Sequence, residues 1–329
     1  MRKCEKLCTE QRFSFHRRAN NQKCNGTTCT DSFQVVDRGR CGESQSWWCH
    51  QEPDFSVGQC GTRLLKKTRK RVVGGFPANA HNWPWMVAIV NSVGKVDCGG
   101  VLLSNTHVLS AAHCFKYNDH YVEVRVGQHK FWPKTFEDIQ KRNSLKVHVH
   151  PNYSAETHAN DFAIIELSER IVFSRFANPA CLPARDQSFG TEKSFCYLSG
   201  WGNTEVIRGE LLSKFRFGVH LTSFGMSDQF KIPQPEELQE RRMYILNESV
   251  CSDVYKEFFV NESMFCAGIM EGGSDACVGD SGSPLACKDA NGLWYVVGIV
   301  SFGIGCAMKG VPSVYASIGS ALEWINTFI

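Results

Sequence analysis

The sequence predicts a large all-β domain of the sandwich or barrel type, preceded by a small disulfide-rich unit. From residue 72 onward, short apolar or alternating runs are separated by turn residues, a texture typical of antiparallel sheets. Before residue 62 there are seven cysteines and few aliphatic side chains, so disulfides must replace a hydrophobic core there. A chain of 329 residues has room for one large domain and one small one.

The expected strands of the large domain are its apolar or alternating runs. The clearest runs are residues 86–90, 101–110, 121–126, 162–167 and 295–301. Residues 317–328 differ, because apolar side chains recur there at the spacing of one helix face and predict a C-terminal helix. These side chains are Ile318, Leu322, Ile325 and Phe328.

Composition divides the chain into three segments. Residues 1–61 are cysteine-rich, residues 62–71 form a basic linker, and residues 72–329 form the large domain. Residues 1–71 carry 15 Lys and Arg against 7 Asp and Glu, whereas residues 72–329 carry 21 against 26. The basic run is either a solvated linker or a site for a protease specific for basic residues, and we expect no nucleic-acid partner.

Cysteine usage indicates an oxidising compartment. Sixteen cysteines are scattered along the chain, without the repeated C-x-x-C pairs typical of zinc sites. Glycosylation triplets begin at Asn25, Asn152, Asn247 and Asn261. Together these features favour a secreted, disulfide-bonded glycoprotein.

Neither a signal peptide nor a membrane span is expected within the chain as given. Its first residues lack the apolar core of a signal peptide, so we expect that it begins downstream of its true start or is incomplete. The longest apolar run, residues 293–302, has the length of a strand and is too short to span a membrane. We therefore expect a soluble, extracellular protein.

Residues 279–284 read Gly-Asp-Ser-Gly-Ser-Pro and carry the strongest chemical signal. A serine between glycines can expose its hydroxyl, and the glycines let the backbone aim consecutive N–H groups at one point. Serine becomes a strong nucleophile only when a neighbouring base accepts its proton and a third group orients that base. Ser281 is therefore a candidate nucleophile that needs two partners elsewhere in the chain.

His113 and Asp161 are the candidate partners. His113 follows an apolar run and precedes Cys114. Asp161 leads into the apolar residues 162–165, where a buried acid needs a partner. Taken singly, such a histidine is more often structural, and such an acid is more often a turn residue at a strand edge.

Five motifs in one order resemble the chymotrypsin-like (trypsin-fold) serine proteases. They are residues 72–75 (Val-Val-Gly-Gly), 111–114 (Ala-Ala-His-Cys), 160–163 (Asn-Asp-Phe-Ala), 199–202 (Ser-Gly-Trp-Gly) and 279–284. The order His, Asp, Ser separates this family from subtilisins and α/β-hydrolases. The resemblance covers residues 72–329 and implies two six-stranded antiparallel β-barrels with a C-terminal helix, and serine endopeptidase activity.

The resemblance also assigns the catalytic roles. Ser281 would attack the scissile carbonyl to form an acyl-enzyme, His113 would transfer the proton, and Asp161 would hold the imidazole in the correct tautomer. The backbone N–H groups of Gly279 and Ser281 would form the oxyanion hole.

A zymogen is implied by the same resemblance. An upstream activating protease would cut between Arg71 and Val72, and the new ammonium group of Val72 would pair with Asp280. Lys70 and Arg71 together also suit a dibasic processing enzyme. An α-amino group titrates near pH ~8, so activity should fall at alkaline pH as this pair is lost.

Ten cysteines are paired by resemblance. The implied bridges are Cys98–Cys114, Cys196–Cys287, Cys251–Cys266, Cys277–Cys306 and Cys60–Cys181, the last tethering the propeptide. The six remaining N-terminal cysteines leave the connectivity of their three bridges open. This unit is similar to the clip domains of arthropod cascade proteases, but its last two cysteines are not adjacent.

The implied specificity pocket has Asp275 at its base and Ser301, Gly303 and Ser313 along its walls. A carboxylate in that place selects substrates with Arg or Lys, because pairing with a cation offsets the free-energy cost of desolvating the carboxylate. Ser313 stands where trypsins carry glycine, so we expect a narrowed pocket that favours one basic side chain or slows turnover.

No cofactor is expected for this chemistry. A calcium loop is doubtful, because Gln128 stands where calcium-binding members carry glutamate, although Glu137 and Asp138 lie nearby in the sequence.

A regulatory protease is the favoured interpretation. The segment between Trp201 and Cys251 is long for a compact digestive enzyme and would restrict access to the cleft. Expected partners are protein substrates with Arg or Lys at the cleavage site and serpin-type inhibitors. Two alternatives stay open, namely a weak or inactive homologue acting as a binding scaffold, and a broad digestive trypsin.

Overall fold

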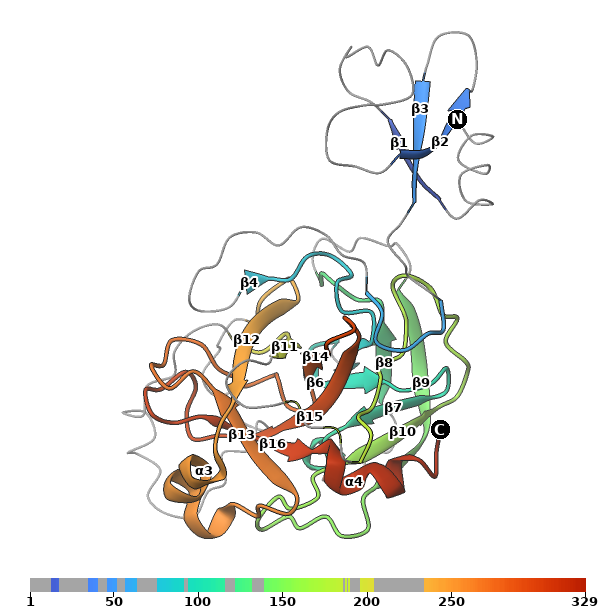
Figure 1. Cartoon of the computed structure of the whole chain (residues 1–329). Helices are drawn as coiled ribbons and strands as arrows, with labels where there is room; N and C mark the ends of the chain where they lie inside the picture. The colour runs from blue at the N-terminus through green and yellow to red at the C-terminus, as the bar shows by residue number, and fades with distance from the viewer. Residues whose placement is uncertain are drawn as a thin grey trace. The chain divides into compact units, whose positions relative to one another are not determined.

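Figure 1 shows the computed structural model of the chain. It describes residues 57–63, 76–91, 94–115, 122–131, 139–185, 187, 189, 196–203 and 234–329, and the backbone of three strands nearer the N-terminus. The chain forms two compact units, Met1–Phe55 and Ser56–Ile329. Residues 57–63, which cover the end of the cysteine-rich segment and the start of the basic linker, therefore belong to the larger unit.

The smaller unit contains a three-stranded antiparallel sheet. Its strands are β1 (Phe13–Arg17), β2 (Val35–Arg40) and β3 (Ser46–Gln51), and β3 lies between the other two. Phe15 and Asp37 lie opposite Cys49 in the two ladders. The pairing of the six N-terminal cysteines lies outside the described residues.

The first half of the larger unit is a closed antiparallel barrel with the strand order β10-β7-β6-β5-β8-β9. The strands are β5 (Met86–Val90), β6 (Val96–Leu102), β7 (His107–Ser110), β8 (Glu123–Val126), β9 (Gln140–Val149) and β10 (Ala163–Leu167). β5 is buried along its whole length. β8 alternates buried Val124 and Val126 with half-buried residues, so only one of its faces contributes to the core.

A second barrel follows, with the strand order β11-β14-β15-β16-β13-β12, and the pairing of β11 with β12 closes it. Its strands are β11 (Cys196–Gly200), β12 (Gln239–Ile245), β13 (Met264–Gly268), β14 (Pro284–Lys288), β15 (Trp294–Phe302) and β16 (Ser313–Ser317). The short strand β4 (Phe76–Pro77) pairs with the first two residues of β12. Two six-stranded antiparallel barrels confirm the predicted all-β fold class.

The run 101–110 is divided between two strands, which corrects the expectation of one continuous run. β6 ends at Leu102 and β7 begins at His107. Between them, the backbone N–H groups of Leu103 and Ser104 donate to the carbonyl of His107 at 3.0 and 3.3 Å and close a tight turn. Because apolar residues lie on both sides of this turn, the hydrophobic pattern of the sequence does not reveal it.

The C-terminal helix α4 spans Ile318–Ile325 and is shorter than the predicted 317–328, because Phe328 lies in a turn beyond it. A second helix, α3 (Glu248–Tyr255), was not predicted. It has eight residues and buries only two of them, so its apolar periodicity is weak, and the 3-10 helix η3 (Lys256–Phe258) follows it.

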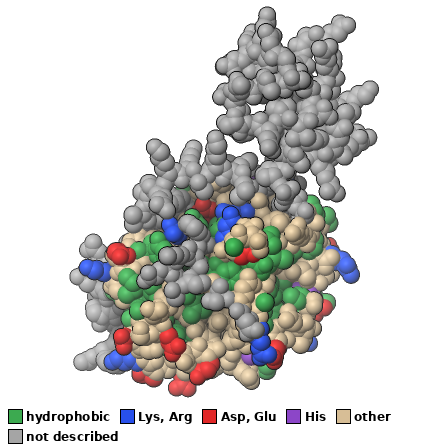
Figure 2. Space-filling view, viewed as in Figure 1, with side chains coloured by type: hydrophobic (Ala, Val, Ile, Leu, Met, Phe, Trp, Pro, Cys, Tyr) green, Lys and Arg blue, Asp and Glu red, His purple; other side chains and the backbone are tan. Residues whose placement is uncertain are grey.

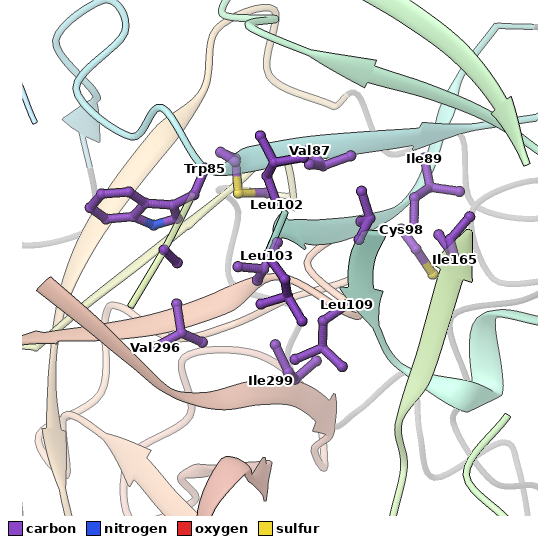
Figure 3. Packing of buried hydrophobic residues seen from close by; sticks show 14 of the residues in the cluster. Trp85, Val87, Ile89, Cys98, Leu102, Leu103, Leu109, Ile165, Val296 and Ile299 are labelled. Carbon is purple, nitrogen blue, oxygen red and sulfur yellow. The ribbon is translucent and has the colours of Figure 1, made fainter. Parts of the chain in front are cut away.

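One hydrophobic core joins the two barrels, and Figure 3 shows side chains from both gathered in it. Trp85, Leu102 and Leu109 contribute from the first barrel, and Val296 and Ile299 contribute from β15 of the second. We call this shared core between the barrels the seam. Because the seam is close-packed, it fixes the positions of the side chains at the strand ends of one barrel relative to those of the other.

The surface of the larger unit carries both signs of charge. On the face shown in Figure 2, lysine and arginine side chains are interspersed with aspartate and glutamate. Among the residues that the structure describes, no helix has the length and apolar character needed to cross a bilayer.

Truncating the core at the seam should destabilise the larger unit. Leu109 is fully buried, so Leu109→Ala should lower the free energy of unfolding by about 2–5 kcal/mol through lost contacts and a cavity. Leu145 is 65% exposed, so Leu145→Ala is a matched control that should change it by less than about 0.5 kcal/mol. Urea unfolding followed by tryptophan fluorescence measures both in a Ser281→Ala background, and equal losses would contradict the assignment of Leu109 to the core.

Candidate active site

Strand pairing in the first barrel brings His113 and Asp161 together. His113 lies in the 3-10 helix η1 (Ala112–Phe115), directly after β7, and Asp161 lies just before β10. The two strands pair with Ser110 opposite Ala163. The Asp161 carboxylate accepts a hydrogen bond from the backbone N–H of His113 at 2.9 Å and lies 2.6 Å from its Nδ1. Both residues are buried.

Asp161 is also held by the second barrel. Ser301 of β15 donates its hydroxyl to Asp161 Oδ2 at 2.5 Å. Burial acts to raise the pKa of Asp161, but the charge of His113 and hydrogen bonds from His113 and His158 outweigh it and hold the pKa well below its ordinary value. The ionised carboxylate therefore directs the Nδ1 proton of His113 toward itself and leaves Nε2 to accept a proton.

His158 is a site residue that sequence reasoning missed. It is buried, its Nδ1 lies 3.8 Å from Asp161 Oδ2, and its ring centroid lies 5.6 Å from that of His113. Its ring also lies 5.4 Å from that of Phe302. Its only sequence signal is a position three residues before Asp161, which does not distinguish it from a chance histidine.

Ser281 lies in the loop before β14, and the loop is packed against the segment that leads into η1. The carbonyl of Ser281 accepts a hydrogen bond from the N–H of Gly99 at 2.7 Å. Gly282 has φ +76°, and a Cβ there would lie 2.3 Å from Ser110 Oγ and 3.2 Å from the nitrogen of Ala111. Only glycine permits this approach, so it holds the serine beside the segment that carries the histidine.

These groups have the composition needed for nucleophilic acyl transfer. An imidazole with an oriented free nitrogen can accept the proton of a serine hydroxyl, and a buried carboxylate stabilises the imidazolium that forms. Gly279 precedes this serine by two residues and has φ +95°, a backbone conformation that L-residues rarely adopt.

Three of the four residues of the expected pocket come together. Asp275 is 7% exposed, and its Oδ1 accepts hydrogen bonds from Ser313 Oγ and from the N–H of Ala276, each at 2.8 Å. A Cβ on Gly303 would lie 3.4 Å from Ser313 Oγ, so these two residues face each other. The side chain of Ser301 is directed to Asp161 instead.

The charge of Asp275 is only partly compensated. Burial raises the pKa of Asp275 to about 7, although the hydrogen bonds from Ser313 and Ala276 act to lower it. The more distant charge of Arg241 also lowers this pKa, and that of Asp280 raises it. A cation placed against this carboxyl group would favour its ionised form.

The five bridges have the pairing that the resemblance implied. They are Cys60–Cys181, Cys98–Cys114, Cys196–Cys287, Cys251–Cys266 and Cys277–Cys306. Three of the glycosylation triplets begin at exposed residues, namely Asn152, Asn247 and Asn261.

Of the residues predicted for activation, glycosylation and a calcium loop, several lie outside the described part of the chain and others are buried. Arg71, Val72, Asn25, Glu137 and Asp138 lie outside the described residues, as does most of the long segment after Trp201. Gln128 is buried and donates its side-chain amide to the carbonyl of Lys130. Asp280 is buried and bonded to the N–H of Gly202 and to Arg241, a second residue that sequence reasoning missed.

Comparison with protein-family models matches residues 72–325 to the family described as Trypsin. The chain belongs to the trypsin family of serine proteases. The matched part contains both barrels, His113, Asp161 and Ser281.

Similar proteins include a trypsin, testisin and a transmembrane protease. Trypsin II-P29 of Gallus gallus is 35% identical over 259 residues, which cover 79% of this chain and 89% of that protein. Testisin of Homo sapiens is 32% identical over 289 residues, which cover 84% of this chain and 82% of that protein. Transmembrane protease serine 9 of Rattus norvegicus is 31% identical over 268 residues, and this chain spans only 23% of its length.

The raised pKa of Asp275 predicts a pH-dependent affinity for cations. As the pH falls below about 7, the carboxyl group becomes neutral, so the Kd of the fluorescent cation p-aminobenzamidine should rise about tenfold for each further pH unit. Ser313→Ala removes a hydrogen bond that lowers this pKa and should move the midpoint to higher pH. Fluorescence titration of the cleaved protein measures both, and a Kd independent of pH between about 5 and 8 would contradict the prediction.

Proposed function

We propose that this chain is the zymogen of a secreted serine endopeptidase that cuts after Arg or Lys. The observation that carries this specificity is the buried carboxyl group of Asp275, which lies against Ser313 and near no fully compensating cation among the described residues. A substrate guanidinium or ammonium group would supply the missing positive charge.

The proposed reaction proceeds through an acyl-enzyme. His113 accepts the proton of Ser281 as the serine oxygen attacks the carbonyl, and it then donates that proton to the leaving amine. Asp161, held by Ser301, keeps the imidazole oriented through both steps. The N–H groups of Gly279 and Ser281 stabilise the oxyanion. Water then hydrolyses the ester by the same steps.

Activation is proposed to occur by cleavage between Arg71 and Val72. Contacts upstream of the cut support a product whose two chains stay joined. Cys60 is bonded to Cys181, and the N–H of Gly61 donates to the carbonyl of Pro179 at 3.0 Å. The guanidinium of Arg63 lies over the rings of Trp83 and Trp294, with 4.4 and 4.0 Å to their centroids.

Secretion and glycosylation are proposed from the chemistry of the chain. Five disulfides among the described residues suit an oxidising compartment, and exposed triplets at Asn152, Asn247 and Asn261 suit glycan attachment. Side chains and backbone N–H groups of the chain supply all the groups that acyl transfer needs, so we propose no catalytic cofactor. Gln128 has a neutral amide where calcium-binding members carry a glutamate carboxylate, so we propose that calcium binds poorly at this position.

A regulatory role is favoured over a digestive one. Ser313 donates to Asp275 and so occupies part of the carboxylate that a substrate cation would bind, which restricts the accepted side chains. Protein substrates with exposed Arg or Lys, an upstream activating protease and serpin-type inhibitors are the partners that this role requires.

Turnover after activation tests the proposed function. The two-chain protein should hydrolyse an Arg-p-nitroanilide, and Ser281→Ala should lower kcat roughly 10⁴-fold or more, because the nucleophile is removed. Leu145→Ala serves as an active control. No turnover by the wild-type protein would favour the binding-scaffold alternative, and rapid degradation of denatured casein at many basic sites would favour a digestive enzyme.

Removing the side chain of Ser313 should increase activity. Ser313→Gly frees Oδ1 of Asp275 from a competing donor and widens the pocket, so kcat/KM for Arg and Lys p-nitroanilides should rise relative to wild type at an alkaline pH, where Asp275 stays ionised without this hydrogen bond. Steady-state kinetics on both substrates measures the effect and shows which basic side chain gains more. An unchanged rate on both would contradict the restriction by Ser313.

A further inference from the structure

Asp280, directly before the nucleophile, already has a buried cationic partner in the uncleaved chain. Arg241 of β12 donates from Nη1 to Asp280 Oδ2 at 2.9 Å, and the two side chains are 2% and 0% exposed. A buried carboxylate without a counter-ion is strongly destabilising, so this pair meets a requirement of the fold. After cleavage, the ammonium of Val72 is expected to serve as a counter-ion for the same carboxylate.

The surroundings of the Asp280 carboxylate leave it a single position. The N–H of Gly202 donates to Oδ1 at 2.7 Å, and the N–H of Cys277 donates to Oδ2 at 3.1 Å. A Cβ on Gly202 would lie 2.2 Å from the carboxylate carbon, and one on Gly200 would lie 2.1 Å from Oδ1. Backbone atoms therefore border the carboxylate, and Arg241 lies against its Oδ2.

Arg241 is itself fixed at the same place. Its Nη2 donates to the carbonyls of Gly202 and Asn203 at 3.3 and 3.2 Å. The guanidinium thus connects the segment after β11 to the acid of the nucleophile loop. A guanidinium stays protonated throughout the pH range of a protease assay.

We propose that Arg241 is a positioning residue for the reaction, a built-in counter-ion that holds Asp280 and thereby the backbone of Gly279 and Ser281. This inference rests on the proposed endopeptidase function. It follows that the uncleaved chain has part of the activity of the two-chain enzyme, and that the ammonium of Val72 adds to a charge balance already supplied by Arg241. Cleavage then increases the rate of an enzyme that is already partly active.

Among the residues that the structure describes, Asp275 and Tyr315 interact with this pair by charge. Burial raises the pKa of Tyr315 well above its ordinary value, and the charges of Asp275 and Asp280 raise it further, so the phenol stays neutral. Asp275, with a pKa raised to about 7, is ionised at alkaline pH. In the two-chain enzyme, the proposed partner of Asp280 that loses its charge above about pH 8 is the amine of Val72.

The experiment uses the full chain locked against cleavage by Lys70→Gln with Arg71→Gln, with its integrity checked on a reducing gel. The locked chain should label with a fluorophosphonate at Ser281 and hydrolyse an Arg-p-nitroanilide. Arg241→Met should lower that rate about 100-fold, the loss typical of a damaged oxyanion hole. In the two-chain enzyme near pH ~7 the same substitution should change the rate far less, because the ammonium of Val72 compensates.

Arg242→Met is the matched control, because Arg242 is the next residue of β12 and lies over the ring of Tyr244 at 5.1 Å. It should leave the activity of both forms unchanged. A structural role alone would make Arg241→Met lower both forms equally, and that result would overturn the proposal.

If Arg241→Met does not fold, Arg241→Lys tests the proposal instead. This variant keeps a positive charge at the position but makes that charge dependent on pH. Lysine loses its proton near pH ~10 and arginine does not, so the locked Arg241→Lys chain should lose activity at alkaline pH while the locked wild-type chain keeps it. Identical pH profiles would overturn the proposal. A locked wild-type chain without activity, beside an active two-chain enzyme, would overturn it and leave the proposed function intact. An inactive two-chain enzyme would overturn both.

Discussion

The carboxylate of Asp161 is held by groups from both barrels at once. His113, from the first barrel, and Ser301, from the second, bond to the same buried acid. Leaving such an acceptor unsatisfied costs about 1–3 kcal/mol, so neither barrel can move away without loss. The packed core through Leu109 and Ile299 holds the barrels in this relation by dispersion and burial. Orientation of the imidazole and docking of the barrels therefore depend on one another.

Three buried acids in this unit have different partners, and the partners decide their roles. Asp161 has a histidine and a hydroxyl and stays ionised. Asp275 has hydrogen bonds from Ser313 and Ala276 but no ion pair among the described residues, so burial raises its pKa to about 7 and leaves it able to bind a cation. Asp280 is bonded to the guanidinium of Arg241 and to two backbone N–H groups, so its place in the fold is fixed. The same side chain thus serves orientation, recognition and support, according to how its charge is balanced.

Much of the fold followed from the sequence, because strand-length apolar runs and contiguous motifs are local signals. The family resemblance then supplied the barrel count and the cysteine pairs. Arg241 and His158 were missed for a physical reason. Arg241 is 39 residues from Asp280 along the chain, and the two meet only because β12 pairs with β11 across the closure of a barrel. No local pattern encodes such a contact. The turn after Leu102 and the short helix α3 were missed because their signals span only a few residues.

The Cys60–Cys181 bridge makes the intervening chain a covalent ring that contains all six strands of the first barrel. A ring of this size lowers the entropy of the unfolded chain by an amount worth about 4–5 kcal/mol. The proposed cut between residues 71 and 72 lies within the ring and opens it, while every barrel contact remains. Cleavage would then enlarge the unfolded ensemble, and the contact that it would add to the folded state is the pairing of the Val72 ammonium with Asp280. Opening the ring would lower the thermodynamic stability of the mature enzyme relative to its precursor, the pairing of the Val72 ammonium would act against this loss, and the lifetime of the enzyme would depend on the barrier to unfolding.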